Sequence, residues 1–334
     1  MNRRVTLASR PVGFPQESDF GLEDAPIPIP ETGEVLVRNL WVSVDPYQRG
    51  RMSEARSYAR SLELGDVVTA QALGEVVESR DGRYEPGDLV VGQLGWQDYA
   101  AARGGSLRRV ADGLDPPTLA LHAVGATGLT AYFGLLDVAK PKPGDTVVVS
   151  GAAGAVGQIV GQIAKLAGCR TVGIAGGPEK AGYLRDLYGY DAAIDYKDGD
   201  VRAALKEACP AGVDVYFDNV GGEITNAVIP RLNVGACIAV CGQISQYNLE
   251  RPEPGPGFVF TIVFRARVQG FLVSDYAHRY DEAATRLARW VAEGKIRWRE
   301  DVTEGLENAP RAFIGMLNGE NQGKALVKVA DPTK

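Results

Sequence analysis

The stretch Ser150-Gly151-Ala152-Ala153-Gly154-Ala155-Val156-Gly157 joins two segments of different periodicity. The run 146–150 before it predicts a short buried strand, and residues 158–167 after it carry apolar residues at helical spacing. Small residues at such a junction allow a tight turn and let the backbone approach a pyrophosphate, whose charge the helix start stabilises. The stretch therefore predicts a dinucleotide site within a βαβ unit. A tight strand–helix turn without a ligand is the alternative.

The sequence after this turn repeats the alternation of strand and helix. Further strands are predicted at 171–175, 192–195, 213–218 and 236–240, with helices at 201–208 and 223–232 between them. An amphipathic helix at 280–293 closes this region. Strands that alternate with helices form a parallel sheet with right-handed crossovers.

The first third of the chain has a different pattern of predicted secondary structure. Short β-type runs at 35–42, 73–78 and 88–92 are separated by glycine, proline and aspartate turns, which predicts a compact, mostly antiparallel domain. The tail 324–329 also reads as a strand. We expect a β-rich domain made of residues 1–123 and 296–334, with an α/β domain inserted at 124–295.

Composition narrows the class of protein. A chain of 334 residues exceeds the usual size of one hydrophobic core, and its net charge of −6 argues against a nucleic-acid partner. Neither a secretory signal nor an apolar run of membrane-spanning length is visible. The four cysteines form no Cys-x-x-Cys pair, so we interpret them as reduced thiols in a cytoplasmic protein.

The second predicted strand of the α/β domain indicates which cofactor binds. Its end reads Ala175-Gly176-Gly177, without the carboxylate that takes the ribose 2′-hydroxyl of NAD. Lys180 follows closely, where it could pair with a 2′-phosphate. An ordinary solvated lysine is the alternative, and spacing alone does not decide between the two.

The sequence offers few zinc ligands, so a catalytic zinc is not expected. The first 168 residues contain no cysteine and a single histidine, His122, while His278 is distant. A tyrosine hydroxyl could then stabilise a developing oxyanion. Tyr47 follows a strand ending near Val44, and Tyr247 lies in a polar loop at the carboxyl end of a parallel strand. Packing or surface roles are the alternatives for both tyrosines.

A series of motifs, in order over nearly the whole chain, resembles the zinc-free medium-chain dehydrogenases/reductases. The resemblance is to the branch with leukotriene/prostaglandin reductase, 2-alkenal reductase and bacterial curcumin reductase. The motifs lie at 44–49, 127–132, 150–157, 175–180, 194–197, 217–222, 241–248 and 319–324.

This resemblance implies a Rossmann domain with a doubly wound parallel sheet, joined to a β-rich, GroES-like substrate and catalytic domain. It implies an NADPH-dependent enzyme that reduces the C=C bond of α,β-unsaturated aldehydes or ketones by hydride transfer to the β-carbon. It also implies a homodimer whose subunits meet through the cofactor-domain sheets.

The resemblance also assigns residues. Lys180 and Tyr196 match positions that hold the 2′-phosphate, and Tyr47 and Tyr247 match tyrosines that line the substrate pocket, which makes them the catalytic candidates. The other implied cofactor contacts are Thr127, Gly151, Ala152, Gly154, Ala155, Val156, Gly157, Gly176, Asn219, Val220, Gly221, Gly242, Tyr247, Phe271, Leu272, Val273 and Asn321.

Two departures concern the substrate pocket. The segment 261–265 lacks a tyrosine that relatives often carry, and the run 66–72 is less glycine-rich than theirs. An NADPH:quinone oxidoreductase and a non-catalytic NADPH-binding protein are the alternative functions. The apolar stretch 258–264 could form the edge of the sheet or a buried strand.

Overall fold

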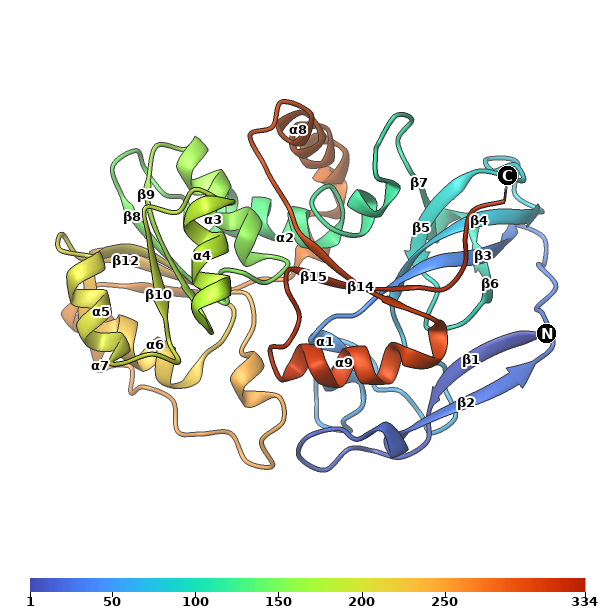
Figure 1. Cartoon of the computed structure of the whole chain (residues 1–334), viewed down its shortest axis with the longest axis horizontal. Coiled ribbons are helices and arrows are strands. Elements are labelled where there is room, and N and C mark those ends of the chain that lie inside the picture. Colours follow the sequence, from blue (N-terminus) through green and yellow to red (C-terminus); the bar gives the residue numbers. More distant parts are fainter. Residues whose placement is uncertain (334) are drawn as a thin grey trace. The chain divides into compact units, whose positions relative to one another are not determined.

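The computed structural model describes residues 1–333, and the chain divides into two compact units. Unit 1 contains Met1–Leu121 and the segment from Glu300 onward, and unit 2 contains His122–Arg299. Both ends of the chain thus build one unit, and the middle of the chain builds the other. Figure 1 shows the two units, coloured along the sequence.

Unit 2 is built on a six-stranded sheet in which all neighbouring strands are parallel. Its strands are β8 (Thr146–Ser150), β9 (Arg170–Ala175), β10 (Ala192–Asp195), β11 (Val213–Asp218), β12 (Leu232–Val240) and β13 (Arg267–Gly270). The strand order is β10-β9-β8-β11-β12-β13, so the direction of winding reverses between β8 and β11. The carboxyl ends of strands at such a switch point form the ligand crevice of doubly wound sheets.

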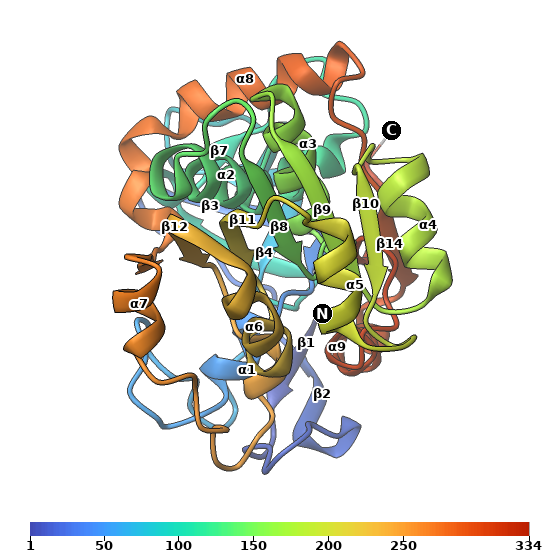
Figure 2. The same cartoon turned by 90° about the vertical axis from the view of Figure 1, so that its left-hand side faces the viewer.

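Helices cover both faces of this sheet (Figure 2). They are α2 (Ala126–Phe133), α3 (Gly157–Leu166), α4 (Pro178–Asp186), α5 (Val201–Ala208), α6 (Gly222–Val228), α7 (Val259–Val263) and α8 (Tyr280–Ala292), with short helical turns η4 (Gly134–Ala139), η5 (Ile229–Arg231), η6 (Ile244–Gln246) and η7 (Val273–Arg279). Right-handed crossovers place α3 and α4 on one face and α5 and α6 on the other. The α/β fold predicted from the sequence is confirmed.

The core of unit 2 explains why its strands are almost wholly apolar. Val148, Ile174 and Ile238 come from three different strands and are buried in one cluster with Leu205 of α5 and Val228 of α6. A parallel sheet covered by helices excludes water from both faces, so its strands need apolar side chains on both sides. This rigid layer holds the loops at the strand ends in place.

Unit 1 contains a seven-stranded sheet and a separate hairpin. The sheet strands are β3 (Glu34–Ser43), β4 (Gln71–Ser79), β5 (Leu89–Gln93), β6 (Tyr99–Arg103), β7 (Arg108–Arg109), β14 (Glu300–Glu304) and β15 (Lys324–Lys328), and the hairpin strands are β1 (Asn2–Leu7) and β2 (Phe20–Ala25). Its helices are α1 (Tyr47–Arg51) and α9 (Ala309–Leu317), with short turns η1 (Glu17–Asp19), η2 (Gly104–Ser106), η3 (Pro117–Leu121) and η8 (Leu306–Asn308). Pairing of β15 with β3 joins the two ends of the chain.

An aromatic cluster packs one side of unit 1. Trp96 is fully buried, and its ring lies 6.0 Å from Phe20 and 5.9 Å from Phe313 of α9. The indole Nε1 donates to the carbonyl of Ser43, which ends β3. The cluster therefore fixes the end of β3, where the chain turns into α1.

Two segments differ from the sequence expectation in their local structure. The turn expected after Val44 continues into the short helix α1, which begins at Tyr47. The apolar stretch 258–264 is neither an edge nor a buried strand, because its central part forms helix α7 and leaves Phe258 and Ile262 exposed. The edge of the sheet is β13, which follows that helix.

Candidate active site

The glycine turn connects β8 to α3 and has the close packing expected of a phosphate cradle. Gly151 adopts a positive φ of 57°, and the amide of Ala152 donates to the carbonyl of Ile174 on β9. A Cβ at Gly157 would collide with the carbonyl oxygen of Gly151 and lie 2.6 Å from the Cα of Ala152. Only glycine fits this position, so the helix starts directly against the turn.

The start of α3 has no side-chain cap. Its N-cap residue is Val156, whose side chain cannot accept a hydrogen bond from the first helical amides. The amide of Gly154 is used within the turn, where it donates to Gly151. An uncapped helix start carries partial positive charge, which suits a phosphate group.

A second group of predicted residues gathers where β9 and β10 end. The Tyr196 ring packs against Gly176 so closely that a Cβ there would lie 2.8 Å from the ring. Lys180 follows in the first turn of α4. Tyr196 keeps 42% of its surface exposed, so the residue is accessible from solvent. The structure thus brings Lys180 and Tyr196 to the same end of neighbouring strands.

Asp195 fixes the backbone where β9 and β10 end, and the sequence analysis did not identify it. Its Oδ1 accepts hydrogen bonds from the amides of Gly177 at 2.7 Å and of Lys197 at 2.9 Å. Two backbone donors therefore engage this carboxylate. Acidic residues are common near strand ends. No sequence signal distinguishes a carboxylate that accepts hydrogen bonds from backbone amides from one that binds the ribose of a cofactor.

Asp218 is the second functional residue that the sequence analysis missed. It ends β11, is 1% exposed, and its Oδ1 accepts from the Ser150 hydroxyl at 3.1 Å and the Tyr216 hydroxyl at 2.9 Å. The amides of Val220 and Gly221 donate to the same oxygen at 3.0 and 2.8 Å. This single carboxylate therefore fixes the backbone of the loop that follows it.

The loop Asn219–Gly221 lies directly against the glycine turn. Asn219 donates through its backbone amide to the Ser150 hydroxyl at 2.9 Å and through Nδ2 to the Ser150 carbonyl at 2.7 Å. A Cβ at Gly151 would be in contact with Asn219 and Val220 at about 3.5 Å. Two segments predicted independently as cofactor contacts are thus neighbours in space.

Tyr247 belongs to a third loop, which stacks on the second. The amides of Ile244 and Ser245 donate to the carbonyls of Asn219 and Val220. The Tyr247 hydroxyl accepts from the amide of Gln243 at 3.2 Å and would lie 3.1 Å from a Cβ at Gly242. The hydroxyl predicted to act in catalysis is therefore held beside the loop predicted to contact the cofactor.

The segment after β13 is anchored by its first side chain. The Phe271 ring packs edge-on against Phe217, 6.1 Å between centroids, and fills the space that a Cβ at Gly134 would need. With that ring packed against Phe217, the backbone of Leu272 and Val273 continues into the η7 turn. Thr127 lies apart on α2, where its hydroxyl donates to the His122 carbonyl at 3.1 Å.

The remaining predicted residues, Tyr47 and Asn321, belong to unit 1. Tyr47 is the first residue of α1, and the Asn321 side chain donates to the Gly323 carbonyl at 2.7 Å. Burial raises the pKa of Tyr47 above its ordinary value, and the nearby Asp45 carboxylate adds to the shift. The hydroxyl therefore keeps its proton at neutral pH and can serve as a donor.

A buried lysine supports the turn before Tyr47. Lys324 is fully buried, and its Nζ donates to Asp45 at 2.9 Å and to the carbonyls of Val44 and Ala325 at 2.8 and 3.0 Å. Asp45 in turn accepts a short hydrogen bond from the Ser43 hydroxyl. The sequence gives no sign that this lysine, at the start of a strand near the C-terminus, would be buried.

Two further findings concern metal sites and membrane-spanning helices. Among residues 1–333, no three or more His, Cys, Asp or Glu side chains come together in a way that could hold a metal ion. No helix in that range is long and apolar enough to cross a membrane.

Comparison with known proteins places the chain in a family. Residues 3–110 match the N-terminal domain of oxidoreductases, and residues 155–289 match the family described as zinc-binding dehydrogenase. The chain is 45% identical to NADPH-dependent curcumin reductase of Escherichia coli, over 98% of this chain and 97% of that protein. It is 46% identical to bovine prostaglandin reductase 1, over 97% and 98% respectively. This chain belongs to the medium-chain dehydrogenase/reductase family.

A solved structure agrees with this assignment. CurA from Vibrio vulnificus in complex with NADPH is 45% identical, superposes with a TM-score of 0.95, and the match covers 99% of this chain and all of that one. The protein is thus an oxidoreductase of the branch that contains the curcumin and prostaglandin reductases. The resemblance found in the sequence motifs is confirmed.

Proposed function

We propose that this reductase uses NADPH to reduce the C=C bond of α,β-unsaturated aldehydes and ketones. The observation that carries the proposal is the stacking of three loops at the switch point of the sheet. These are the glycine turn, the loop 219–221 and the loop that holds Tyr247. A donor hydroxyl therefore lies beside the cradle for a dinucleotide, in a chain similar along its length to NADPH-dependent curcumin reductase.

The residues of this site fit a 2′-phosphorylated dinucleotide. The close packing at Gly157 admits no side chain, so the uncapped start of α3 lies directly against the turn and can face a pyrophosphate. Lys180 and Tyr196 would hold the 2′-phosphate, since the nearby Asp195 carboxylate is engaged by backbone amides. NADPH, when bound, would supply the hydride for the β-carbon, and a proton from solvent or from one of the tyrosine hydroxyls would complete the saturated product at the α-carbon.

The protein's own contribution is to orient the substrate and to stabilise charge. As the β-carbon is reduced, negative charge develops on the carbonyl oxygen of the substrate. We assign the hydroxyl of Tyr247 or that of Tyr47 to donate to this oxygen, because a protonated tyrosine is a good hydrogen-bond donor and a poor base near neutral pH. Burial, which raises the pKa of Tyr47, keeps that group in the donating form.

Product analysis tests the proposed function. The full chain is expected to oxidise NADPH in the presence of an (E)-2-alkenal and to release the saturated aldehyde, with NADH much less effective. The measurement is NADPH absorbance combined with chromatography of the product. Release of the allylic alcohol would show carbonyl reduction instead. No oxidation across enals, enones and quinones would support a protein that only binds the cofactor.

Replacing Tyr247 with phenylalanine is expected to lower kcat for an enone about tenfold, the effect of losing one ordinary hydrogen bond in the transition state. KM for NADPH should change little, because the cradle and the loop 219–221 are retained. Steady-state kinetics measure both constants. Tyr99→Phe, on β6 of unit 1, is the control and should behave like the wild type. An unchanged kcat in Tyr247→Phe would remove this residue from the chemistry.

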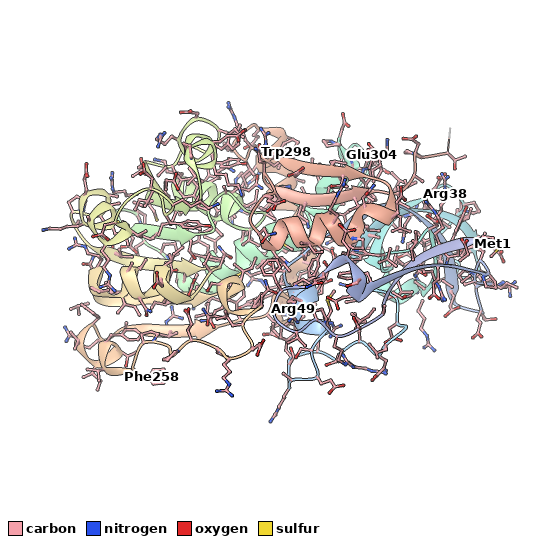
Figure 3. The ribbon with its side chains drawn as sticks, turned by 60° about the horizontal axis from the view of Figure 1, so that its bottom comes forward. Met1, Arg38, Arg49, Phe258, Trp298 and Glu304 are labelled. Carbon is pink, nitrogen blue, oxygen red and sulfur yellow. The ribbon has the colours of Figure 1, made fainter. Side chains whose placement is uncertain are left out.

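The surface of unit 2 supports a homodimer. Strand β13 forms one edge of the sheet with all four residues exposed, and α7 presents Ile262 at 76% exposure next to Phe258 at 80%. Figure 3 shows Phe258 at the periphery of the molecule. An unpaired parallel edge flanked by exposed apolar side chains is suited to pairing with a second copy of the chain.

The cysteines support the location that we propose, the cytoplasm. All four are free thiols, and Cys169, Cys209 and Cys237 are buried. Burial raises the pKa of Cys169 and of Cys209 to about 11 and that of Cys241 to about 12. Thiols held in the neutral form are inert and suit a reducing compartment.

A further inference from the structure

Helix α1 carries two half-buried side chains with polar atoms that are themselves shielded from solvent and make no hydrogen bond. The Tyr47 hydroxyl lies near the Gln93 side chain but makes no hydrogen bond of normal geometry, and Nε and Nη1 of Arg51 have no partner among residues 1–333. Tyr47 and Arg51 are four positions apart, so both project from the same face of the helix, with Cβ atoms about 5–6 Å apart. Two hydrogen-bond donors without acceptors on one face of α1 suit a ligand that carries two acceptor groups.

The acidic side chains around α1 are engaged by other cations. Asp45 is paired with Lys324 at 2.9 Å, and Glu63 lies 3.7 Å from both Arg10 and Arg60. No ion pair reaches Arg51 among the described residues. A guanidinium stays charged at every physiological pH, so Arg51 carries a positive charge that no carboxylate of residues 1–333 pairs with.

The two groups also act on each other. Burial is the main cause that raises the pKa of Tyr47, and the positive charge of Arg51 acts in the opposite direction. The guanidinium therefore lies within electrostatic reach of the hydroxyl. A substrate whose carbonyl oxygen meets Tyr47 would place its neighbouring atoms next to Arg51.

Physical chemistry decides which ligand group suits Arg51. Guanidinium N–H groups that are shielded from solvent and lack acceptors are unfavourable, and the acceptor that compensates best is a carboxylate, through charge-assisted hydrogen bonds. The separation along α1 sets the span from the carbonyl oxygen to the anion at roughly one helical turn, about 5 Å. A chain of three methylene groups between a ketone and a carboxylate covers such a span.

We propose that Arg51 recognises a carboxylate on the substrate, so that the enzyme prefers unsaturated oxo-acids over neutral enones. This inference rests on the proposed function and on the placement of the substrate carbonyl at Tyr47. Arg51 is then a specificity-determining residue. Its contribution should appear in KM, because the carboxylate is bound equally in the ground state and in the transition state.

The test compares (E)-5-oxo-6-octenoate with its methyl ester. Three methylene groups isolate the enone from the carboxyl end, so the two compounds differ in charge and have the same reacting bond. The wild type is expected to show kcat/KM about 10- to 100-fold higher for the acid, the range of a charge-assisted hydrogen bond. In Arg51→Met the ratio of acid to ester should fall to about one, and Arg51→Lys should keep part of it.

Arg60→Met is the matched control, since Arg60 is an exposed arginine of the same segment, and it should keep the wild-type ratio. Equal kcat/KM for acid and ester in the wild type would overturn the inference without any variant, while leaving the reductase function intact. A preference that persists in Arg51→Met would overturn it as well. Failure to reduce either compound would refute the proposed function and the inference together.

Discussion

Replacing Lys324 with methionine is expected to lower the free energy of unfolding by about 3–5 kcal/mol. The Nζ of Lys324 donates to Asp45 and to two backbone carbonyls, and the side chain is fully buried. Methionine preserves the volume of the lysine stem and removes every one of these donors. The Asp45 carboxylate, of which only 14% is exposed, would then remain charged without its cation. Chemical denaturation of the full chain measures the loss.

The same substitution should also lower activity, because Asp45 precedes the helix that carries Tyr47. The amide of Asp45 donates to the Gln48 side chain at 2.8 Å, which ties the turn to α1. Lys328→Met is the matched control. Lys328 lies on the same strand and pairs with the exposed Asp331, so its loss should change stability by less than about 0.5 kcal/mol. Equal effects of the two substitutions would contradict the role assigned to Lys324.

A second substitution distinguishes two contributions to the lost stability, the unpaired charge of Asp45 and the changed packing around residue 324. Asp45→Asn in the Lys324→Met background removes the carboxylate charge that the first change leaves without a partner. Part of the lost stability should return, because an unpaired buried charge costs more than an amide in the same place. A double variant less stable than Lys324→Met alone would show that the charge is not the main cause.

Lys324 also shows why part of the site could not be predicted from the sequence. The glycine turn was recognised because strand, turn and helix are contiguous, so their periodicities are visible in one short window. The partners Lys324 and Asp45 are 279 positions apart, and their pairing depends on β15 lying beside β3. A lysine near the end of a chain is usually exposed, and nothing local marks this one as buried.

The segment 258–264 shows that a local sequence pattern can also be misleading. Its run of apolar residues was expected to be a strand, since continuous hydrophobicity is typical of a parallel sheet interior. In the structure its middle forms α7, with Phe260 and Phe264 packed on the core of unit 2 and Ile262 exposed. A continuous apolar run can form a buried strand, or it can form a short helix that leaves apolar side chains on the surface. Periodicity alone cannot distinguish these two structures.

Replacing Asp218 with alanine is expected to lower the free energy of unfolding by at least about 3 kcal/mol and kcat/KM for NADPH about 100-fold. Oδ1 of Asp218 accepts from two hydroxyls and from the amides of Val220 and Gly221, and Oδ2 accepts from Thr225 at 2.7 Å. Alanine would leave the Ser150 hydroxyl and the amides of Val220 and Gly221 without this acceptor, while the Tyr216 and Thr225 hydroxyls could still bond to each other at 3.2 Å. The loop 219–221 would then lose its fixed position against the glycine turn.

Asp218→Asn is the matched variant for this prediction, because it keeps the shape of the side chain and one acceptor oxygen. The amides of Val220 and Gly221 can still donate to that oxygen, and the Thr225 hydroxyl can turn to accept from the new amide group. We expect kcat/KM for NADPH to fall less than tenfold and the loop to keep its place. Thermal unfolding with and without NADPH, together with kinetics, compares the two variants. If alanine and asparagine behave alike, the carboxyl oxygens do not position the loop, and the hydrogen bonds of Asn219 to Ser150 must hold it instead.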